Sequence, residues 1–367
     1  MVFAVVTGGG TSGHVIPAQA ILEALQENGV SPERLKYVGS RRGVETTLMS
    51  SSEIGCEFLP ISGLQRSLSV RSLARNLALL WRLPYSNLLA RRLVKKWQPR
   101  VVVSVGGYAS QPMSSAARRS GVPLVCVSYD RVAGLATRRQ SRYAQVCAVA
   151  FSDTSLPNAQ HTGAPVRAVL RHLDVRASRE SARRALGIDP HALCVTIVGG
   201  SLGSGVLNNI VATLASACAR LDNVVIYHLC GVRNENEPPA VVPPNVHYVR
   251  RGYEFRMAEL YAATDVLIAR AGASTVAEIA TVGVASVLVP WSAAAEHHQE
   301  LNARWLSENG GALVVSENEI GTSWGIQAVV ELLENSTHRG EIAARAYELG
   351  AIHRGKSLVE VIENAAR

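Results

Sequence analysis

The sequence predicts an α/β protein made of two similar halves, each built around a parallel sheet. Short runs of β-branched residues alternate with helical segments along most of the chain, which is typical of parallel sheets. A strand, a glycine-rich turn and a helix open the chain within residues 1–28, and the same order begins again at 194–205. The chain has 367 residues, more than one hydrophobic core usually supports, so two domains are expected.

Four strands are expected in the first half. FAVVTGGG leads into a helix from about residue 16 to residue 28, and LKYVGS follows as the second strand. RVVVSVGG at 100–107 and PLVCVSY at 123–129 are the third and fourth strands, because both are short and rich in valine.

The second half restarts at CVTIVGGSLGSG and continues with the strands NVVIYHLCG, DVLIARAG and ASVLVPW. We place the N-terminal domain at residues 1–162 and the C-terminal domain at 163–340. A final helix over about 341–366, within the remaining segment 341–367, is expected to cross back to the first half.

Cysteine usage and hydropathy favour a reducing, cytoplasmic compartment. The six cysteines are scattered without a C-x-x-C pair, so neither a zinc site nor a disulfide framework is predicted. The first residues lack the basic segment of a secretory signal, and no apolar stretch approaches the roughly 18 residues of a membrane span. A soluble protein, or one bound to a membrane surface, is expected.

The charge of +8 is unevenly distributed, since no acidic residue lies between Glu57 and Asp130. A block of one sign favours an anionic partner, and the alternative is a solvated basic face. The basic residues of this interval are Arg66, Arg71, Arg75, Arg82, Arg91, Arg92, Lys95, Lys96, Arg100, Arg118 and Arg119.

The opening loop TGGGTSGHVIPAQA matches G-x-G-x-x-G at Gly8, Gly10 and Gly13. Such a turn brings backbone N–H groups and a helix N-terminus to a phosphate. A dinucleotide site needs an acid at the end of the second strand, where this chain has Arg41 and Arg42. These arginines would suit a 2′-phosphate, so NADP remains an alternative, although a second glycine loop counts against it.

His14 and Pro17 follow the last glycine of this loop. The positive potential at a helix N-terminus disfavours protonation of an imidazole, and a neutral histidine is a candidate general base. The alternative is a histidine that caps the helix or packs against it.

A second candidate site lies in RAGASTVAEIATVGVASVLVP, at residues 270–290. Ser274 and Thr275 are expected to cap a helix whose N–H groups can hold a diphosphate. Glu278 can accept hydrogen bonds from the two vicinal hydroxyls of a ribose, or merely complement the helix dipole.

The next segment, WSAAAEHHQELNA, offers Gln299 as a hydrogen-bonding partner for sugar hydroxyls. His297, His298 and Glu300 are expected to be exposed rather than to bind a metal, because adjacent residues of a helix do not share a face. The chain has no Asp-x-Asp pair to hold a divalent ion. Helix N-termini, backbone N–H groups and arginine would therefore have to meet the charge of a diphosphate.

Together these segments resemble the MurG glycosyltransferases of peptidoglycan synthesis. TGGGTSGHVIPAQA, SVGGYASQP, TGAPVR, GGSLGS and GASTVAEIATVG occur in the family's order and spacing. The resemblance implies a GT-B fold, in which two Rossmann-like domains face a cleft, with the acceptor and membrane on the N-terminal side and the UDP-sugar donor on the C-terminal side. It implies an inverting, metal-independent transfer of N-acetylglucosamine from UDP onto the 4-hydroxyl of lipid-linked N-acetylmuramyl-pentapeptide.

The resemblance also implies site residues, position by position. His14 matches the family histidine and is our candidate base, while Glu278 matches the ribose-binding glutamate and Gln299 the glutamine that contacts the donor sugar. The other matching positions are Thr11, Ser12, Gly13, Arg167, Ser201 and the helix start Ala273, Ser274, Thr275, Val276, Ala277.

One motif departs from the family. Many members have His-Glu-x-Asn after the fourth strand, whereas this chain has Val127, Ser128, Tyr129 and Asp130. Asp130 thus replaces an asparagine, and a carboxylate cannot donate a hydrogen bond as an amide can.

The resemblance suggests a function for the basic interval between Glu57 and Asp130. Its arginines surround an apolar stripe that suits the surface of an anionic membrane, although the same stripe would also suit a helix packed on the sheet. The stripe consists of Leu73, Leu77 and Leu80, and the apolar surface is extended past Pro84 by Trp81, Leu83, Leu88, Leu89 and Leu93.

The expected partners are UDP-N-acetylglucosamine, a lipid-linked acceptor and an anionic membrane, without nucleic acid or cofactor. The expected location is peripheral, on the cytoplasmic face of the cell membrane. The alternatives are a GT-B transferase for another lipid or natural product, a non-catalytic UDP-sugar-binding relative, and an NADP oxidoreductase. A sugar-nucleotide epimerase would need further carboxylates near the sugar.

Overall fold

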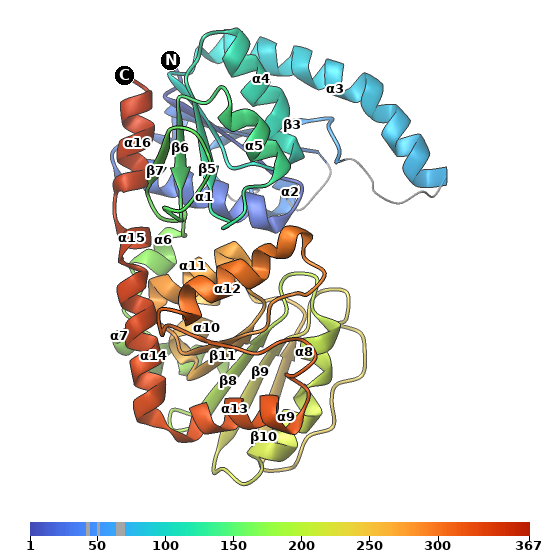
Figure 1. Cartoon of the computed structure of the whole chain (residues 1–367), viewed down its shortest axis with the longest axis vertical. Coiled ribbons are helices and arrows are strands. Elements are labelled where there is room, and N and C mark those ends of the chain that lie inside the picture. Colours follow the sequence, from blue (N-terminus) through green and yellow to red (C-terminus); the bar gives the residue numbers. More distant parts are fainter. Residues whose placement is uncertain (42–44, 50–51, 64–69) are drawn as a thin grey trace. The chain divides into compact units, whose positions relative to one another are not determined.

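The computed structural model of this chain describes all residues except 42–44, 50–51 and 64–69, and its description of side chains also omits 70–80. The chain forms two compact units (Figure 1). Unit 1 comprises residues 1–168 and 355–367, and unit 2 comprises 169–354. The division lies beyond the expected boundary at 162 because the carboxylate of Glu23, in unit 1, binds the side chain of Arg167 and the backbone N–H of Ala168.

Unit 1 contains a parallel sheet in the order β3-β2-β1-β4-β5-β6-β7. The order reverses its direction between β1 and β4, and the carboxyl ends of strands at such a point are where binding sites open in sheets of this class. The strands are β1 (Ala4–Thr7), β2 (Leu35–Ser40), β3 (Gly55–Leu59), β4 (Val101–Ser104), β5 (Leu124–Ser128), β6 (Val146–Val149) and β7 (Ala159–His161).

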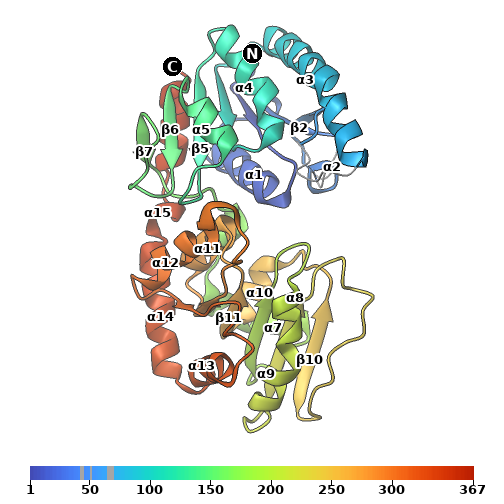
Figure 2. The ribbon, with the colours of Figure 1, turned by 45° about the vertical axis from the view of Figure 1, so that its right-hand side comes forward.

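Helices cover both faces of this sheet (Figure 2). One face carries α1 and α16, which pack together, and α3 packs on α4. The amide of Asn28, at the end of α1, donates to Glu363 of α16 at 2.6 Å. The helices are α1 (Ser12–Glu27), η1 (Pro32–Arg34), α2 (Glu45–Leu48), α3 (Val70–Trp97), η2 (Tyr108–Ser110), α4 (Gln111–Arg119), α5 (Leu135–Ser141) and α16 (Ser357–Ala365).

Unit 2 repeats the pattern with a parallel sheet in the order β10-β9-β8-β11-β12-β13. The switch point here lies between β8 and β11. The strands are β8 (Leu193–Val198), β9 (Val224–Leu229), β10 (Val246–Arg251), β11 (Val266–Ala269), β12 (Ser286–Leu288) and β13 (Leu313–Val314). The helices are α6 (Ala168–Arg171), α7 (Val175–Leu186), α8 (Gly205–Asn209), α9 (Val211–Cys218), α10 (Met257–Ala263), α11 (Ala273–Val282), η3 (Ala295–His297), α12 (His298–Ser307), α13 (Ser323–Glu334), α14 (Ser336–Leu349) and α15 (Ala351–Arg354).

Two helices differ from the sequence-based expectation. The first begins at Ser12 rather than near residue 16, so His14 lies in its first turn and Pro17 lies inside it. The expected final helix is divided into α14, α15 and α16. Gly350 separates α14 from α15, and a side chain is excluded there because a Cβ would lie 1.9 Å from the carbonyl oxygen of Ala280.

Buried His228 predicts that unit 2 loses stability in acid. Its Nδ1 pairs with the Tyr248 hydroxyl at 2.9 Å and its Nε2 with the Asn208 side chain at 3.0 Å. Burial, together with the charge of Arg250, lowers the pKa of His228 from 6.5 to about 4. As pH falls, the unfolded chain therefore takes up a proton before the folded chain does. Stability present in full above pH 6.5 should be lost progressively down to about pH 4, by roughly 3 kcal/mol.

Urea unfolding at pH 7 and at pH 5 checks this expectation. His228→Gln should reduce the pH dependence of the unfolding free energy, whereas the exposed control His338→Gln should leave it unchanged. An equal pH dependence in wild type and His228→Gln would contradict the assignment.

Candidate active site

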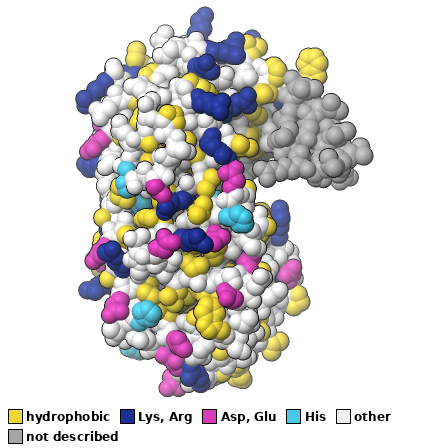
Figure 3. Space-filling model, in the orientation of Figure 1, with side chains coloured by type: hydrophobic (Ala, Val, Ile, Leu, Met, Phe, Trp, Pro, Cys, Tyr) yellow, Lys and Arg dark blue, Asp and Glu magenta, His cyan; other side chains and the backbone are white. Residues whose placement is uncertain are grey.

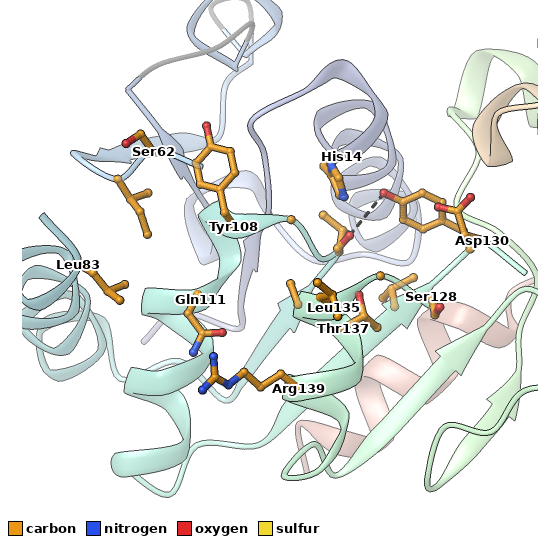
Figure 4. A pocket seen from close by; sticks show the side chains of 17 residues that line it. His14, Ser62, Leu83, Tyr108, Gln111, Ser128, Asp130, Leu135, Thr137 and Arg139 are labelled. Atoms are coloured by element: carbon orange, nitrogen blue, oxygen red, sulfur yellow. Dashed lines mark hydrogen bonds between the residues drawn. The ribbon is translucent and has the colours of Figure 1, made fainter. Parts of the chain in front are cut away.

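Unit 1 contains a cavity of about 640 Å³ at the carboxyl ends of β4 and β5. Figure 4 shows His14 and Asp130 on one side of this cavity and Gln111 beside Arg139 on the other. Most of the remaining lining is apolar or weakly polar: Ile61, Ser62, Leu83, Val105, Gly107, Tyr108, Val127, Ser128, Tyr129, Gly134, Leu135, Ala136 and Thr137.

The imidazole of His14 is fixed from several directions. Its Nδ1 lies 3.0 Å from the hydroxyl oxygen of Thr11, the residue that precedes α1. The backbone after β4 also passes close to it, since a Cβ on Gly107 would lie 3.3 Å from Cγ of His14 and 2.7 Å from the Gly9 carbonyl oxygen. The Tyr129 ring stands edge-on, 6.4 Å from the imidazole centre.

These surroundings favour the neutral imidazole. Burial lowers the pKa of His14, and the negative charge of Asp130 opposes that effect only in part. The position in the first turn of a 16-residue helix also disfavours a positive charge. His14 therefore lines the cavity in the protonation state that a general base requires.

The other site residues that the MurG resemblance assigns to unit 1 lie in two different parts of it. Thr11 precedes α1, and Ser12 and Gly13 begin it beside His14. Asp130, two residues after the end of β5, lines the cavity together with His14. Arg167 instead lines a separate cavity of about 340 Å³ in unit 1.

Arg167 is engaged by side chains of α1. Its Nε donates to Glu23 at 2.7 Å and its Nη1 to the Gln19 amide oxygen at 3.1 Å. The guanidinium is thus held by an ion pair that the motif TGAPVR did not predict, because both partners lie far away in sequence.

Glu45 occupies part of the first glycine loop. This fully buried carboxylate accepts a hydrogen bond from the backbone N–H of Gly10 at 2.5 Å. A dinucleotide phosphate would need that N–H and would be repelled by the carboxylate. The G-x-G-x-x-G match therefore does not make this loop a dinucleotide site, which argues against the NADP alternative.

The start of α11 in unit 2 differs from the predicted cap. Gly272 is the residue before the helix, and within the described chain no side chain accepts from the first turn, so the expected capping by Ser274 and Thr275 is wrong. The backbone of Gly272 has the extended conformation usual for a capping residue, with φ at −64° and ψ at 145°, but glycine has no side chain that could accept a hydrogen bond. The N–H groups of residues 273–275 are consequently not capped by a hydroxyl, which is the arrangement that suits a diphosphate.

Glu278 is oriented by a tyrosine that the sequence analysis missed. The Tyr261 hydroxyl donates to Glu278 Oε2 at 2.8 Å, and Tyr261 is almost fully buried. A carboxylate has about four acceptor positions, so this contact leaves capacity for ribose hydroxyls. Tyr261 could not be found by motif, because a tyrosine inside α10 is usually a core residue.

Gln299 lies in the first turn of α12, and Ser201 lies in the loop after β8. The backbone N–H of Trp291 donates to the side-chain oxygen of Gln299 at 3.0 Å. The NH₂ group of the same amide therefore points away from Trp291, where it can donate to another acceptor. Ser201 is half-buried in the loop after β8, and its carbonyl accepts from Val232 at 3.3 Å.

The loop bearing Trp291 is braced by an ion pair. Glu317 binds Arg270 at 2.5 Å and the backbone N–H of Ser292 at 2.8 Å. His297 is exposed, and His298 makes a local contact, its Nδ1 lying 2.7 Å from the Ala295 carbonyl oxygen. In the part of the chain that the structure describes, no cluster of three or more His, Cys, Asp or Glu is arranged to hold a metal.

Comparisons with known proteins agree with this architecture. The chain matches the N-terminal domain of glycosyltransferase family 28 over residues 4–149 and the C-terminal domain of that family over 194–360. A protein of Desulforudis audaxviator, named UDP-N-acetylglucosamine–N-acetylmuramyl-(pentapeptide) pyrophosphoryl-undecaprenol N-acetylglucosamine transferase, is 34% identical over 99% of this chain and 98% of its own length. A protein of a Nocardioides species with the same name is 35% identical over 93% and 92%.

Solved structures give the same result. MurG of Acinetobacter baumannii has a TM-score of 0.70 at 26% identity and covers 99% of this chain and 98% of its own. A UDP-GlcNAc 2-epimerase of Neisseria meningitidis, at 14% identity and a TM-score of 0.64, shares the fold. The chain is a glycosyltransferase with the GT-B fold, and it belongs to the MurG family of N-acetylglucosamine transferases.

Proposed function

We propose that this enzyme transfers N-acetylglucosamine from UDP-N-acetylglucosamine to the 4-hydroxyl of undecaprenyl-diphospho-N-acetylmuramyl-pentapeptide. The observation that supports it most directly is a neutral, half-buried histidine at the mouth of a helix, lining a cavity large enough for a sugar. Relatives named for this reaction match this chain over at least nine-tenths of its length and of their own.

The proposed mechanism is a direct displacement with inversion and without a metal. The acceptor hydroxyl attacks the anomeric carbon, the bond to the UDP oxygen breaks, and the hydroxyl proton passes to Nε2 of His14. This requires the tautomer in which Nδ1 donates to the Thr11 oxygen, since Nε2 then keeps its lone pair. The uncapped N–H groups at the start of α11 would stabilise the charge that develops on UDP.

The donor is assigned to unit 2. We infer that Ala273, Ser274 and Thr275 meet the diphosphate, that Glu278 binds the ribose and that the NH₂ group of Gln299 contacts the sugar. Ser201, Val276 and Ala277 complete this set, whereas Thr11, Ser12, Gly13 and Asp130 are assigned to the acceptor side.

An assay with UDP-N-acetylglucosamine and the lipid-linked acceptor tests this function. UDP release and lipid product should rise together in equal amounts. UDP release without a lipid product, or transfer only to other lipids, would overturn the acceptor assignment. Binding of a nicotinamide cofactor, seen as a fluorescence change on titration, would instead support the NADP alternative.

The same proposal includes a peripheral position on the cytoplasmic face of the membrane. Trp81, Leu83, Tyr85 and Leu88 of α3 are all at least 38% exposed, and we call them the α3 patch. Leu89 and Leu93 pack on the core instead, and the side chains of Leu73, Leu77 and Leu80 lie outside the described residues. None of the helices in the described ranges has the length and apolarity to cross a bilayer.

Charge supports this assignment. Figure 3 shows Lys and Arg side chains spread over the visible face of unit 1. Arg82 neighbours the α3 patch in sequence, and Arg91, Arg92, Lys95 and Lys96 continue along the same helix. Anionic headgroups suit such a surface, because basic side chains attract them while the exposed rings and leucines enter the interface.

The protein should therefore sediment with vesicles that contain anionic lipid, and the bound fraction should fall as salt rises. A double variant Trp81→Ser/Leu88→Ser should weaken the binding, while Trp324→Ser, an exposed tryptophan of unit 2, should not. Equal binding to neutral vesicles would contradict the electrostatic part of the proposal.

A further inference from the structure

The first helix contains a backbone defect beside the candidate base. Pro17 lies within α1 and has no N–H, so it cannot donate to the carbonyl oxygen four residues earlier. That carbonyl belongs to Gly13, the residue directly before His14. The α-helical hydrogen bond that would close the turn around His14 is therefore missing.

A side chain from a distant strand supplies a donor at this point. The hydroxyl of Tyr129, just after β5, donates to the Gly13 carbonyl oxygen at 2.7 Å. It also lies 3.4 Å from the carbonyl oxygen of Val105, after β4. Tyr129 is only 7% exposed, so water does not readily replace it in this contact.

The contact joins the three segments that surround the imidazole. The Tyr129 hydroxyl holds the turn that carries His14, while its ring stands edge-on to the imidazole at 66°. The same side chain fixes the backbone from which Asp130 extends into the cavity. Removing the hydroxyl would leave the Gly13 carbonyl without this hydrogen bond. The turn that orients the His14 imidazole would then be less firmly held.

We propose that Tyr129 is a positioning residue for His14, whose hydroxyl replaces the hydrogen bond that Pro17 cannot make to Gly13. The inference rests on the proposed function in so far as His14 is the base. In this assignment the ring of Tyr129 lines the cavity, while its hydroxyl exchanges no proton with the substrate because it donates to the Gly13 carbonyl oxygen.

Tyr129→Phe removes only the oxygen and tests the proposal first. We expect kcat to fall about 10- to 100-fold, as a small misplacement of a catalytic group does. The KM values of both substrates should stay within about twofold, because the lost contact binds neither. The pH dependence of kcat should also shift, which a purely structural tyrosine would not cause. Tyr347→Phe, a half-exposed tyrosine of unit 2, is the matched control.

Pro17→Ala provides a second, sharper test. Alanine restores the N–H that can donate to Gly13 within the helix, so Tyr129→Phe should cost much less in a Pro17→Ala background. The double variant should recover most of the kcat lost in Tyr129→Phe alone. The proposal is overturned if Tyr129→Phe keeps full activity, or if its loss of kcat is as large in the Pro17→Ala background as in the wild-type background.

A spectroscopic readout separates this inference from the proposed function. In protein labelled with ¹⁵N-histidine, Tyr129→Phe should change the titration of the His14 imidazole, and the double variant should restore it. If the wild type transfers no sugar but these shifts occur, the function fails and the positioning role stands. Unchanged His14 signals in Tyr129→Phe would overturn the positioning role whatever the activity.

Discussion

Replacing His14 by alanine should lower kcat by about 10²- to 10⁴-fold, the usual contribution of a general base. The imidazole lines the unit 1 cavity, and its environment keeps it neutral: burial lowers the pKa of His14 below 6.5. The base should therefore stay active as pH falls below 6.5, and the acidic limb of kcat should lie under that value. Removal of the ring leaves the hydroxyl proton to weaker acceptors such as water or Asp130, which lines the same cavity.

Steady-state kinetics at saturating concentrations of both substrates measure this effect. The affinity for UDP should be unchanged in His14→Ala, because the donor is assigned to unit 2. His338→Ala replaces an exposed histidine and serves as the control. Near-normal turnover in His14→Ala would refute the base assignment and direct attention to Asp130, which lines the same cavity.

Glu278→Ala should weaken binding of UDP-N-acetylglucosamine by roughly 10- to 100-fold. Hydrogen bonds to a charged group each contribute about 1.5–3 kcal/mol, and the proposed contact joins the carboxylate to ribose hydroxyls. Tyr261 holds this carboxylate through Oε2, so the group is already oriented before the donor arrives. The effect should fall mainly on the donor Kd and KM, with a smaller change in kcat.

Calorimetric titration with UDP and with 2′-deoxy-UDP resolves the contact. Wild type should prefer UDP, and Glu278→Ala should lose most of that preference. Glu331→Ala, an exposed glutamate of α13, is the control. An unchanged affinity for UDP in Glu278→Ala would remove Glu278 from the ribose site.

Strong local patterns made much of the fold predictable. Short runs of apolar, largely buried residues marked β1, β4, β5, β8 and β11, because both faces of a central parallel strand are covered. Strand β3 escaped notice: its sequence GCEFL is only partly buried at the sheet edge and contains a glycine and a glutamate. The start of α1 was placed too late because the effect of Pro17 on a helix depends on a partner elsewhere in the fold.

The candidate site was predictable only where the chain itself brings residues together. Thr11 and His14 are three residues apart and meet within one turn of α1. Tyr129, Glu45 and Tyr261 act across long sequence distances and belong to no motif, so only the folded chain reveals them. The pairing of Arg167 with Glu23 was hidden for the same reason.

The return of the chain to unit 1 after unit 2 has a consequence for biosynthesis. Helix α16 buries Leu358, Val359 and Ile362, and it packs on β4, β5 and β6 as well as on α1. A ribosome makes residues 355–367 only after all of unit 2. While unit 2 is translated, β4, β5 and β6 of unit 1 therefore lack the helix that later packs on one side of them. Unit 1, although it is begun first, therefore cannot complete its fold until residues 355–367 have been made.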